Sequence, residues 1–190
     1  MANRHSSALT TILAEFEIQK NPANALGMAR FGISGANTYG ISMPIVRGIA
    51  KLHRNDHALA LELWETGIHE ARILASLVDD PRAVTKKQMK AWAQDFDSWD
   101  IVDGCCNNLF VRTPFAHEMA LKWSINKREY IRRAGFVLMA VCAVHDKGAP
   151  NEVFAGYCVQ IIDGSTDERN FVKKAVNWAL RQIGKRNETL

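Results

Sequence analysis

The sequence has little of what marks a secreted, disulfide-linked or metal-binding protein. Its 190 residues include only four cysteines and five prolines. The cysteines, none of which forms a Cys-x-x-Cys pair, are Cys105, Cys106, Cys142 and Cys158. All four lie in apolar stretches, so we interpret them as small buried hydrophobic residues that suit a reducing compartment.

Long hydrophobic runs are also missing. The longest apolar run, Ala134 to His145, is too short to span a bilayer and is typical of a buried core helix. The start of the chain, Met1 to Ser7, lacks the continuous apolar run of a signal peptide. We therefore expect a cytoplasmic protein without a membrane partner.

Metal and nucleotide motifs are absent as well. His53 and His57 stand four residues apart, but the intervening Arg-Asn-Asp does not match the His-Glu-x-x-His pattern of a zinc site. We assign no metal and no cofactor. The formal net charge is +4. A balance this mildly basic permits a nucleic-acid partner without establishing one.

Apolar residues recur at helical spacing along most of the chain, and no run alternates as a strand does. We predict an all-α protein with helices at about 6–20, 23–32, 42–54, 56–66, 69–79, 85–95, 98–110, 114–123, 127–145, 150–162 and 167–185. Ser165 or Thr166, followed by Asp167 and Glu168, is expected to open the last helix.

Short helices joined by short turns favour antiparallel pairs. Pairs that repeat every ~30–45 residues predict a HEAT-like or ARM-type α-solenoid. We expect one domain over 1–190, curved, with a basic concave face. An irregular helical bundle is the structural alternative.

The last predicted helix carries two stripes. The core stripe consists of Val172, Val176, Ala179 and Ile183. The second stripe places an indole in a row of cations, at Lys174, Trp178, Arg181 and Lys185. One interpretation is a solvated face on which lysine stems cover Trp178. The other is a phosphate-binding strip with an aromatic platform beside it.

Asp103 follows Trp99 by four residues, so both side chains share one side of a helix next to its apolar stripe. A carboxylate in that position requires a partner. Arg133 is the candidate, because it starts an uncharged run that predicts a buried helix; Arg132 points about 100° away and is expected to face solvent. A structural ion pair and a catalytic pair both fit the pattern.

Several motifs together resemble the AlkD-type DNA alkylation repair glycosylases, a family of HEAT-like repeat DNA glycosylases, from about Asn21 to Asn187. The segments that carry the resemblance are Asn21-Pro22 with Met28-Ala29-Arg30-Phe31, Tyr39–Pro44, Leu63-Trp64-Glu65 with His69-Glu70, Trp99–Asp103, and Arg132-Arg133-Ala134 with Lys174–Arg181.

The resemblance implies a monomeric HEAT-like stack that binds double-stranded DNA and hydrolyses the N-glycosidic bond of cationic N3- or N7-alkylated purines without flipping the base. It implies that Asp103 is the catalytic carboxylate, that Trp99 and Trp178 are the aromatic pair at the lesion, and that Arg133 is the active-site arginine. Arg133 is also expected to hold a phosphate and to keep Asp103 ionised.

The resemblance further implies DNA contacts for Phe31 and for the cations of the last helix, which are Lys174, Arg181 and Lys185. Phe31 occupies a position where catalytic members carry a tyrosine, so the ring is kept and the hydroxyl is lost. Two alternatives to the glycosylase stay open. The loss of the hydroxyl suits a non-catalytic DNA-binding member of the family. Because stacks of this kind often serve as adaptors, a helical scaffold for another protein is the second alternative.

Overall fold

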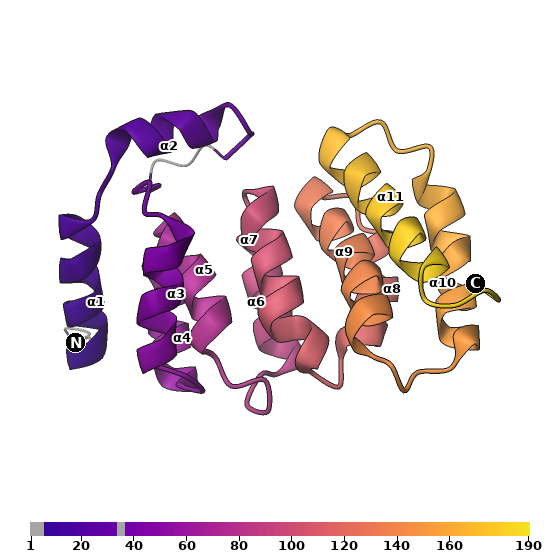
Figure 1. Ribbon diagram of the computed structural model, residues 1–190, viewed down its shortest axis with the longest axis horizontal. Helices are drawn as coiled ribbons and strands as arrows, with labels where there is room; N and C mark the ends of the chain where they lie inside the picture. Colours follow the sequence, from indigo (N-terminus) through magenta and orange to yellow (C-terminus); the bar gives the residue numbers. More distant parts are fainter. Residues whose placement is uncertain (1–5, 34–36) are drawn as a thin grey trace. The chain divides into compact units, whose positions relative to one another are not determined.

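The computed structural model describes residues 6–33 and 37–190, and in this part of the chain the regular structure is helical throughout (Figure 1). The expectation about a signal peptide falls largely on residues outside these ranges. The α-helices are α1 (Ser7–Ile18), α2 (Pro22–Ala29), α3 (Met43–Leu52), α4 (His57–Glu65), α5 (His69–Val78), α6 (Lys86–Gln94), α7 (Trp99–Gly104), α8 (Ala116–Ser124), α9 (Glu129–His145), α10 (Asn151–Gly164) and α11 (Asn170–Gly184).

Each predicted helix is present, but two differ from expectation. The helix predicted over 98–110 ends at Gly104 and continues as a π-helical turn, η1 (Cys105–Leu109), and a 3-10 turn, η2 (Phe110–Arg112). The last helix begins at Asn170 rather than at 167. The reason is that the Asp167 carboxylate accepts hydrogen bonds from the backbone and side chain of Arg169, which closes a turn ahead of the helix.

The chain packs into two compact units, Met1–Thr85 and Lys86–Leu190. A single domain over 1–190, its curvature and its basic concave face all concern the placement of these units and stay predictions. Within the described residues, no helix has the length and apolarity that crossing a membrane requires.

The first unit is organised around Glu70, which is 1% exposed. Its carboxylate accepts hydrogen bonds from the backbone N–H groups of Tyr39, Gly40 and Ile41 at 2.7–3.2 Å. These bonds hold the segment that leads into α3. Gly40 has φ +74°, and a Cβ there would collide with the backbone of Asn21, so only glycine fits.

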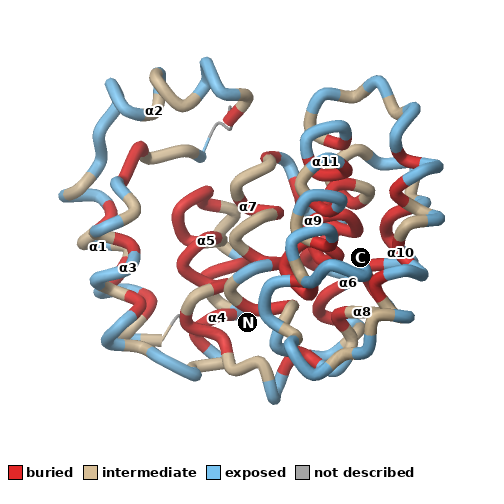
Figure 2. Tube along the Cα trace, turned by 45° about the vertical axis from the view of Figure 1, so that its right-hand side comes forward, coloured by how far each residue is buried: buried red, intermediate tan, exposed pale blue. Residues whose placement is uncertain are grey.

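In the second unit, α9 is the central helix, and eleven consecutive residues, Arg133–Ala143, are buried (Figure 2). Helices α7 and α11 pack on either side of α9 in one layer, while α8 and α10 contact each other in a second layer (Figure 1). Helix α6 contacts α9 as well. Gly135 lets α9 approach the end of α8, because a Cβ at this position would meet the Ser124 backbone.

Candidate functional site

The centre of the candidate site is an ion pair between Asp103, near the C-terminal end of α7, and Arg133, in the second turn of α9. Arg133 Nε donates to Asp103 Oδ1 at 3.0 Å, and Arg133 Nη2 donates to Asp103 Oδ2 at 2.7 Å. This two-pronged geometry is the strongest that a guanidinium and a carboxylate can form. The pairing that the sequence indicated for Asp103 and Arg133 is therefore present.

The two partners differ in their exposure. The Arg133 side chain is 6% exposed and that of Asp103 is 23% exposed. Burial raises the pKa of the Asp103 carboxyl above its usual value, while the Arg133 hydrogen bonds and charge oppose that rise. Asp103 is thus a partly desolvated carboxylate that is held in one orientation and still reaches the surface.

Arg133 is turned inward. Its third nitrogen, Nη1, donates to the backbone carbonyl of Phe171 at 2.7 Å, so all three nitrogens have partners inside the unit. The expectation that Arg133 holds a phosphate does not agree with this geometry, because the guanidinium is both occupied and buried. In the structure, Arg133 holds the Asp103 carboxylate and joins α9 to the start of α11.

Local structure explains where Asp103 lies. Asp100, in the first turn of α7, accepts from the Ser98 hydroxyl at 2.7 Å and from the Ile101 backbone N–H at 3.0 Å, which fixes the start of the helix. Directly after Asp103 the chain widens into the π-turn η1. Such turns occur often at functional sites because the extra residue changes the direction in which side chains project.

Aromatic side chains lie near Arg133. The Arg133 guanidinium carbon lies 5.9 Å from the centre of the Trp99 ring. Tyr130 and Phe171 form a tilted ring pair with centroids 5.8 Å apart, and Lys174 Nζ lies 6.0 Å from the centre of the Phe171 ring. Sequence reasoning missed Tyr130 and Phe171, although Tyr130 stands three residues before Arg133 and so shares its side of α9.

A second ion-pair network fixes the start of α11. Arg132 bonds Asp163 at 2.8 Å and Asp167 at 3.2 Å, and Arg169 bonds Asp167. The expectation that Arg132 faces solvent is therefore wrong, because Asp163, in the last turn of α10, and Asp167, in the turn before α11, both pair with it. The hydrogen bonds from Arg169 lower the pKa of Asp167 to about 2.

The cationic stripe of the last helix is present on α11. Lys174, Arg181 and Lys185 are exposed and Trp178 is half-buried, while the predicted core stripe on the same helix is buried. Trp178 stands seven residues after Phe171, which is about 10 Å along a helix. Lys174 is the member of the stripe that lies over the ring of Phe171, whose backbone carbonyl accepts a hydrogen bond from Arg133.

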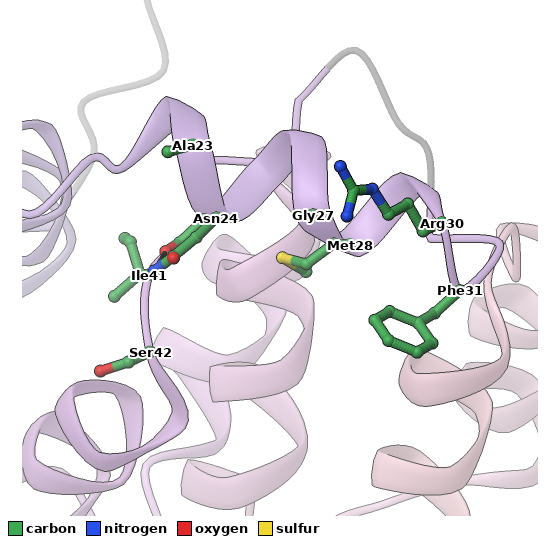
Figure 3. Close-up of a pocket in the computed structure, with 9 residues that line it drawn as sticks. Ala23, Asn24, Gly27, Met28, Arg30, Phe31, Ile41 and Ser42 are labelled. Carbon is green, nitrogen blue, oxygen red and sulfur yellow. Dashed lines mark hydrogen bonds between the residues drawn. The ribbon is translucent and has the colours of Figure 1, made fainter.

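Phe31 belongs to the first unit, where it follows α2 and is 70% exposed. It lines a pocket of about 420 Å³ together with Met28, Arg30 and Ser42 (Figure 3). No residue of α2 is buried, so this helix presents its side chains to solvent (Figure 2). Phe31 and Asp103 belong to different units, so a shared site for them stays a prediction.

The cysteines carry no observed chemistry. Cys105, Cys106 and Cys142 are buried and Cys158 is partly buried, and all four are free thiols. Burial raises the pKa of Cys142 to about 12. Among residues 6–33 and 37–190, no three histidine, cysteine or acidic side chains gather as a metal site.

Comparison with known proteins identifies the family. The model of the DNA alkylation repair enzymes matches residues 12–190, so the chain belongs to the DNA alkylation repair enzyme family. No curated protein matches the chain. One solved structure superposes with a TM-score of 0.79, at 19% identity, over 92% of this chain and 75% of the other.

That structure belongs to a protein described as one of "a new family of proteins related to the HEAT-like repeat DNA glycosylases with affinity for branched DNA structures". At this identity the likeness shows the fold alone. It confirms the predicted all-helical, HEAT-like fold class. The family match confirms the resemblance drawn from the motifs.

Proposed function

We propose that this protein is a DNA glycosylase that binds duplex DNA as a monomer and releases cationic N3- or N7-alkylated purines without flipping the base. It acts in the cytoplasm and needs no cofactor. The observation that carries the proposal is Asp103, a carboxylate that the buried Arg133 holds in a two-pronged hydrogen bond and that remains 23% exposed.

The chemistry requires one well-placed negative charge. An alkylated purine is already cationic, so the C1′–N bond breaks with its electron pair leaving on the base and needs little acid catalysis. Positive charge then develops on the sugar. The Asp103 carboxylate stabilises that oxocarbenium-like state and orients a water whose oxygen bonds to C1′, with its proton passing to the carboxylate. A single electrostatic group of this kind contributes about 3–4 kcal/mol.

The surrounding residues take supporting roles in this proposal. Arg133 positions Asp103 and favours its charged form. Trp99 and Trp178 contact the cationic nucleotide through their rings, at about 0.5–2 kcal/mol each. Lys174, Arg181 and Lys185 follow the phosphate backbone from α11, and Phe31 supplies a further DNA contact from the first unit.

The experiment is release of 7-methylguanine from duplex DNA by wild type, Asp103→Asn and Asp163→Asn. Asp163 is the matched control because it also pairs with an α9 arginine, at 2.8 Å, but with its side chain 68% exposed. We expect Asp103→Asn to abolish release while DNA binding persists, and Asp163→Asn to leave release near the wild-type rate. Release that survives in Asp103→Asn would exclude Asp103 as the catalytic group.

A second candidate function is binding of branched DNA without base excision. Two observations favour it: the structural relative is described as having affinity for branched DNA, and Phe31 provides a ring without a hydroxyl. This candidate predicts salt-dependent binding of DNA and no release of 7-methylguanine by the wild-type protein.

A further inference from the structure

A cluster of lysines lies on the second unit, away from Asp103 and the α11 stripe. It consists of Lys86, Lys87 and Lys90 of α6 with Lys122 of α8, and we call it the α6–α8 lysine patch. Lys87, Lys90 and Lys122 are exposed. Glu118 of α8 lies among them and forms an ion pair with Lys86. The hydrogen bond from Lys86, followed by the charges of Lys86, Lys122 and Lys90, lowers the pKa of Glu118.

The position of these lysines on α6 is unfavourable for the helix itself. The first turn of α6 reads Lys86-Lys87-Gln88-Met89 and contains no carboxylate. A helix N-terminus carries partial positive charge, so cations there reduce helix stability and acidic residues increase it. Lys87 and Lys90 are exposed, so packing does not explain them. The result is a concentrated positive potential, which suits a phosphate-bearing ligand.

The patch faces away from the candidate site. The buried side of α6, with Met89 and Trp92, contributes to the core, and both α6 and α8 contact α9. Their exposed sides therefore point away from the layer of α7, α9 and α11 that carries Asp103 and the α11 stripe. A DNA duplex is stiff over far longer distances than the thickness of two helical layers. One straight duplex segment cannot lie on both faces.

We propose that the α6–α8 lysine patch binds the phosphate backbone of a second DNA duplex segment while the α7–α9–α11 layer holds the first. Lysine suits this task because a mobile point charge contacts phosphates without reading sequence. The proposal rests on the DNA binding stated under Proposed function. It extends that function from one duplex to two arms, as a DNA junction presents them.

The test compares a four-way DNA junction with a linear duplex that carries the sequence of two of its arms, across a series of salt concentrations. The variant Lys87→Gln/Lys90→Gln/Lys122→Gln removes three charges and leaves the Lys86–Glu118 pair in place. We expect its junction affinity to fall by about 10- to 100-fold and the salt slope to decrease by about 2 to 3, at about 0.9 per phosphate contact. Linear-duplex affinity and 7-methylguanine release should stay within about twofold of wild type.

Two matched variants complete the design. Lys51→Gln/Arg54→Gln/Lys147→Gln removes the same charge from exposed positions outside the patch and should leave junction affinity within about threefold of wild type. Glu118→Gln removes the carboxylate from the patch and should strengthen junction binding by about threefold to tenfold. Circular dichroism and thermal melting check that every variant folds.

The outcomes separate this proposal from the proposed function. Unchanged junction binding in the patch variant would overturn the proposal and leave an acidic protein partner as the use of the lysines. An equal loss for junction and linear duplex, or an equal loss in the control variant, would also overturn it. Failure of wild type to bind any DNA would contradict the proposed function itself.

Discussion

Two neighbouring arginines of α9 each pair with an aspartate, and the two pairs have opposite electrostatics. In the Arg133–Asp103 pair, burial outweighs the guanidinium and raises the pKa of Asp103. In the network of Arg132, Asp167 and Arg169, hydrogen bonds outweigh burial and lower the pKa of Asp167 to about 2. The two aspartates thus shift in opposite directions, mainly because burial dominates at Asp103 while the hydrogen bonds from Arg169 dominate at Asp167.

Under the proposed function, this difference separates a catalytic pair, Arg133–Asp103, from a structural network around Asp167. Asp167 is satisfied by two guanidiniums at the turn before α11, so its charge stabilises the fold. Asp103 has a single guanidinium, Arg133, and remains partly desolvated, an arrangement that is costly in stability. In the proposed function, the charge of Asp103 offsets this cost by stabilising the positive charge that develops on the sugar.

Replacing Arg133 by alanine should have the largest effect on base release, and replacing Arg132 is the comparison. Arg133→Ala leaves Asp103 without its partner and its orientation, so we expect base release to fall by about 100-fold or more. Arg132→Ala should change release by less than about threefold, because the Asp167–Arg169 pair still closes the turn. Single-turnover release of 7-methylguanine measures both. Equal losses in the two variants would remove the distinction between the pairs.

The ion pairs of Asp167 should have the largest effect on how the free energy of unfolding changes at acid pH. Because the folded-state pKa of Asp167 is lowered, its contribution is complete above the unfolded value of about 4 and is lost as the pH falls to about 2. Asp167→Asn should therefore destabilise the protein by about 2 kcal/mol near neutral pH and by much less near pH 2. Urea unfolding at several pH values tests this. Asp163→Asn, with its exposed side chain, should cost less than about 1 kcal/mol.

Under the proposed function, the Arg133–Asp103 pair should determine the pH at which activity falls on the acid side of the pH–rate profile. In the proposed mechanism base release requires ionised Asp103, so the rate should fall with decreasing pH at a value above the ordinary aspartate range. Arg133→Lys keeps the charge but loses the two-pronged bond, so its acid limb should move to higher pH. A pH–rate profile of both proteins is the measurement. An identical limb in Arg133→Lys would show that Arg133 does not act through Asp103.

The smallest effect is expected at Tyr130. Burial raises the pKa of its hydroxyl, so the side chain is neutral at working pH. Tyr130→Phe preserves the ring contact with Phe171 and should change release by less than about twofold. Tyr130→Ala removes a contact of about 0.5–1.5 kcal/mol and should weaken binding of lesion-bearing DNA. Binding isotherms distinguish the two, and equal losses would assign the effect to the hydroxyl.

Much of this structure was predictable because helical periodicity is a local property. The apolar spacing located every helix, and the core stripe of α11 is buried as expected. The position of Asp103 beside an apolar stripe was enough to predict a partner, since an uncompensated charge there is costly. Arg133 lies 30 residues from Asp103 in the chain, but it could still be predicted as the partner because it precedes a long uncharged run.

Other features depend on contacts that no local pattern contains. Arg132 was expected in solvent, but the α10–α11 turn brings Asp163 and Asp167 to it. The π-turn after Asp103 replaces an expected regular helix. Phe171 joins the site through its backbone carbonyl, which any residue type has, so its identity carried no signal.

By itself the sequence determined the helices, the family and the pairing of Asp103 with Arg133, because periodicity and burial of charge follow from residue order and type. Only the tertiary structure decided which way each charge points. In the tertiary structure Arg133 points inward, and Arg132 pairs with two carboxylates. The α6–α8 lysine patch faces away from the layer that contains Asp103. Those directions depend on how helices distant in sequence pack, and packing is a property of the whole unit.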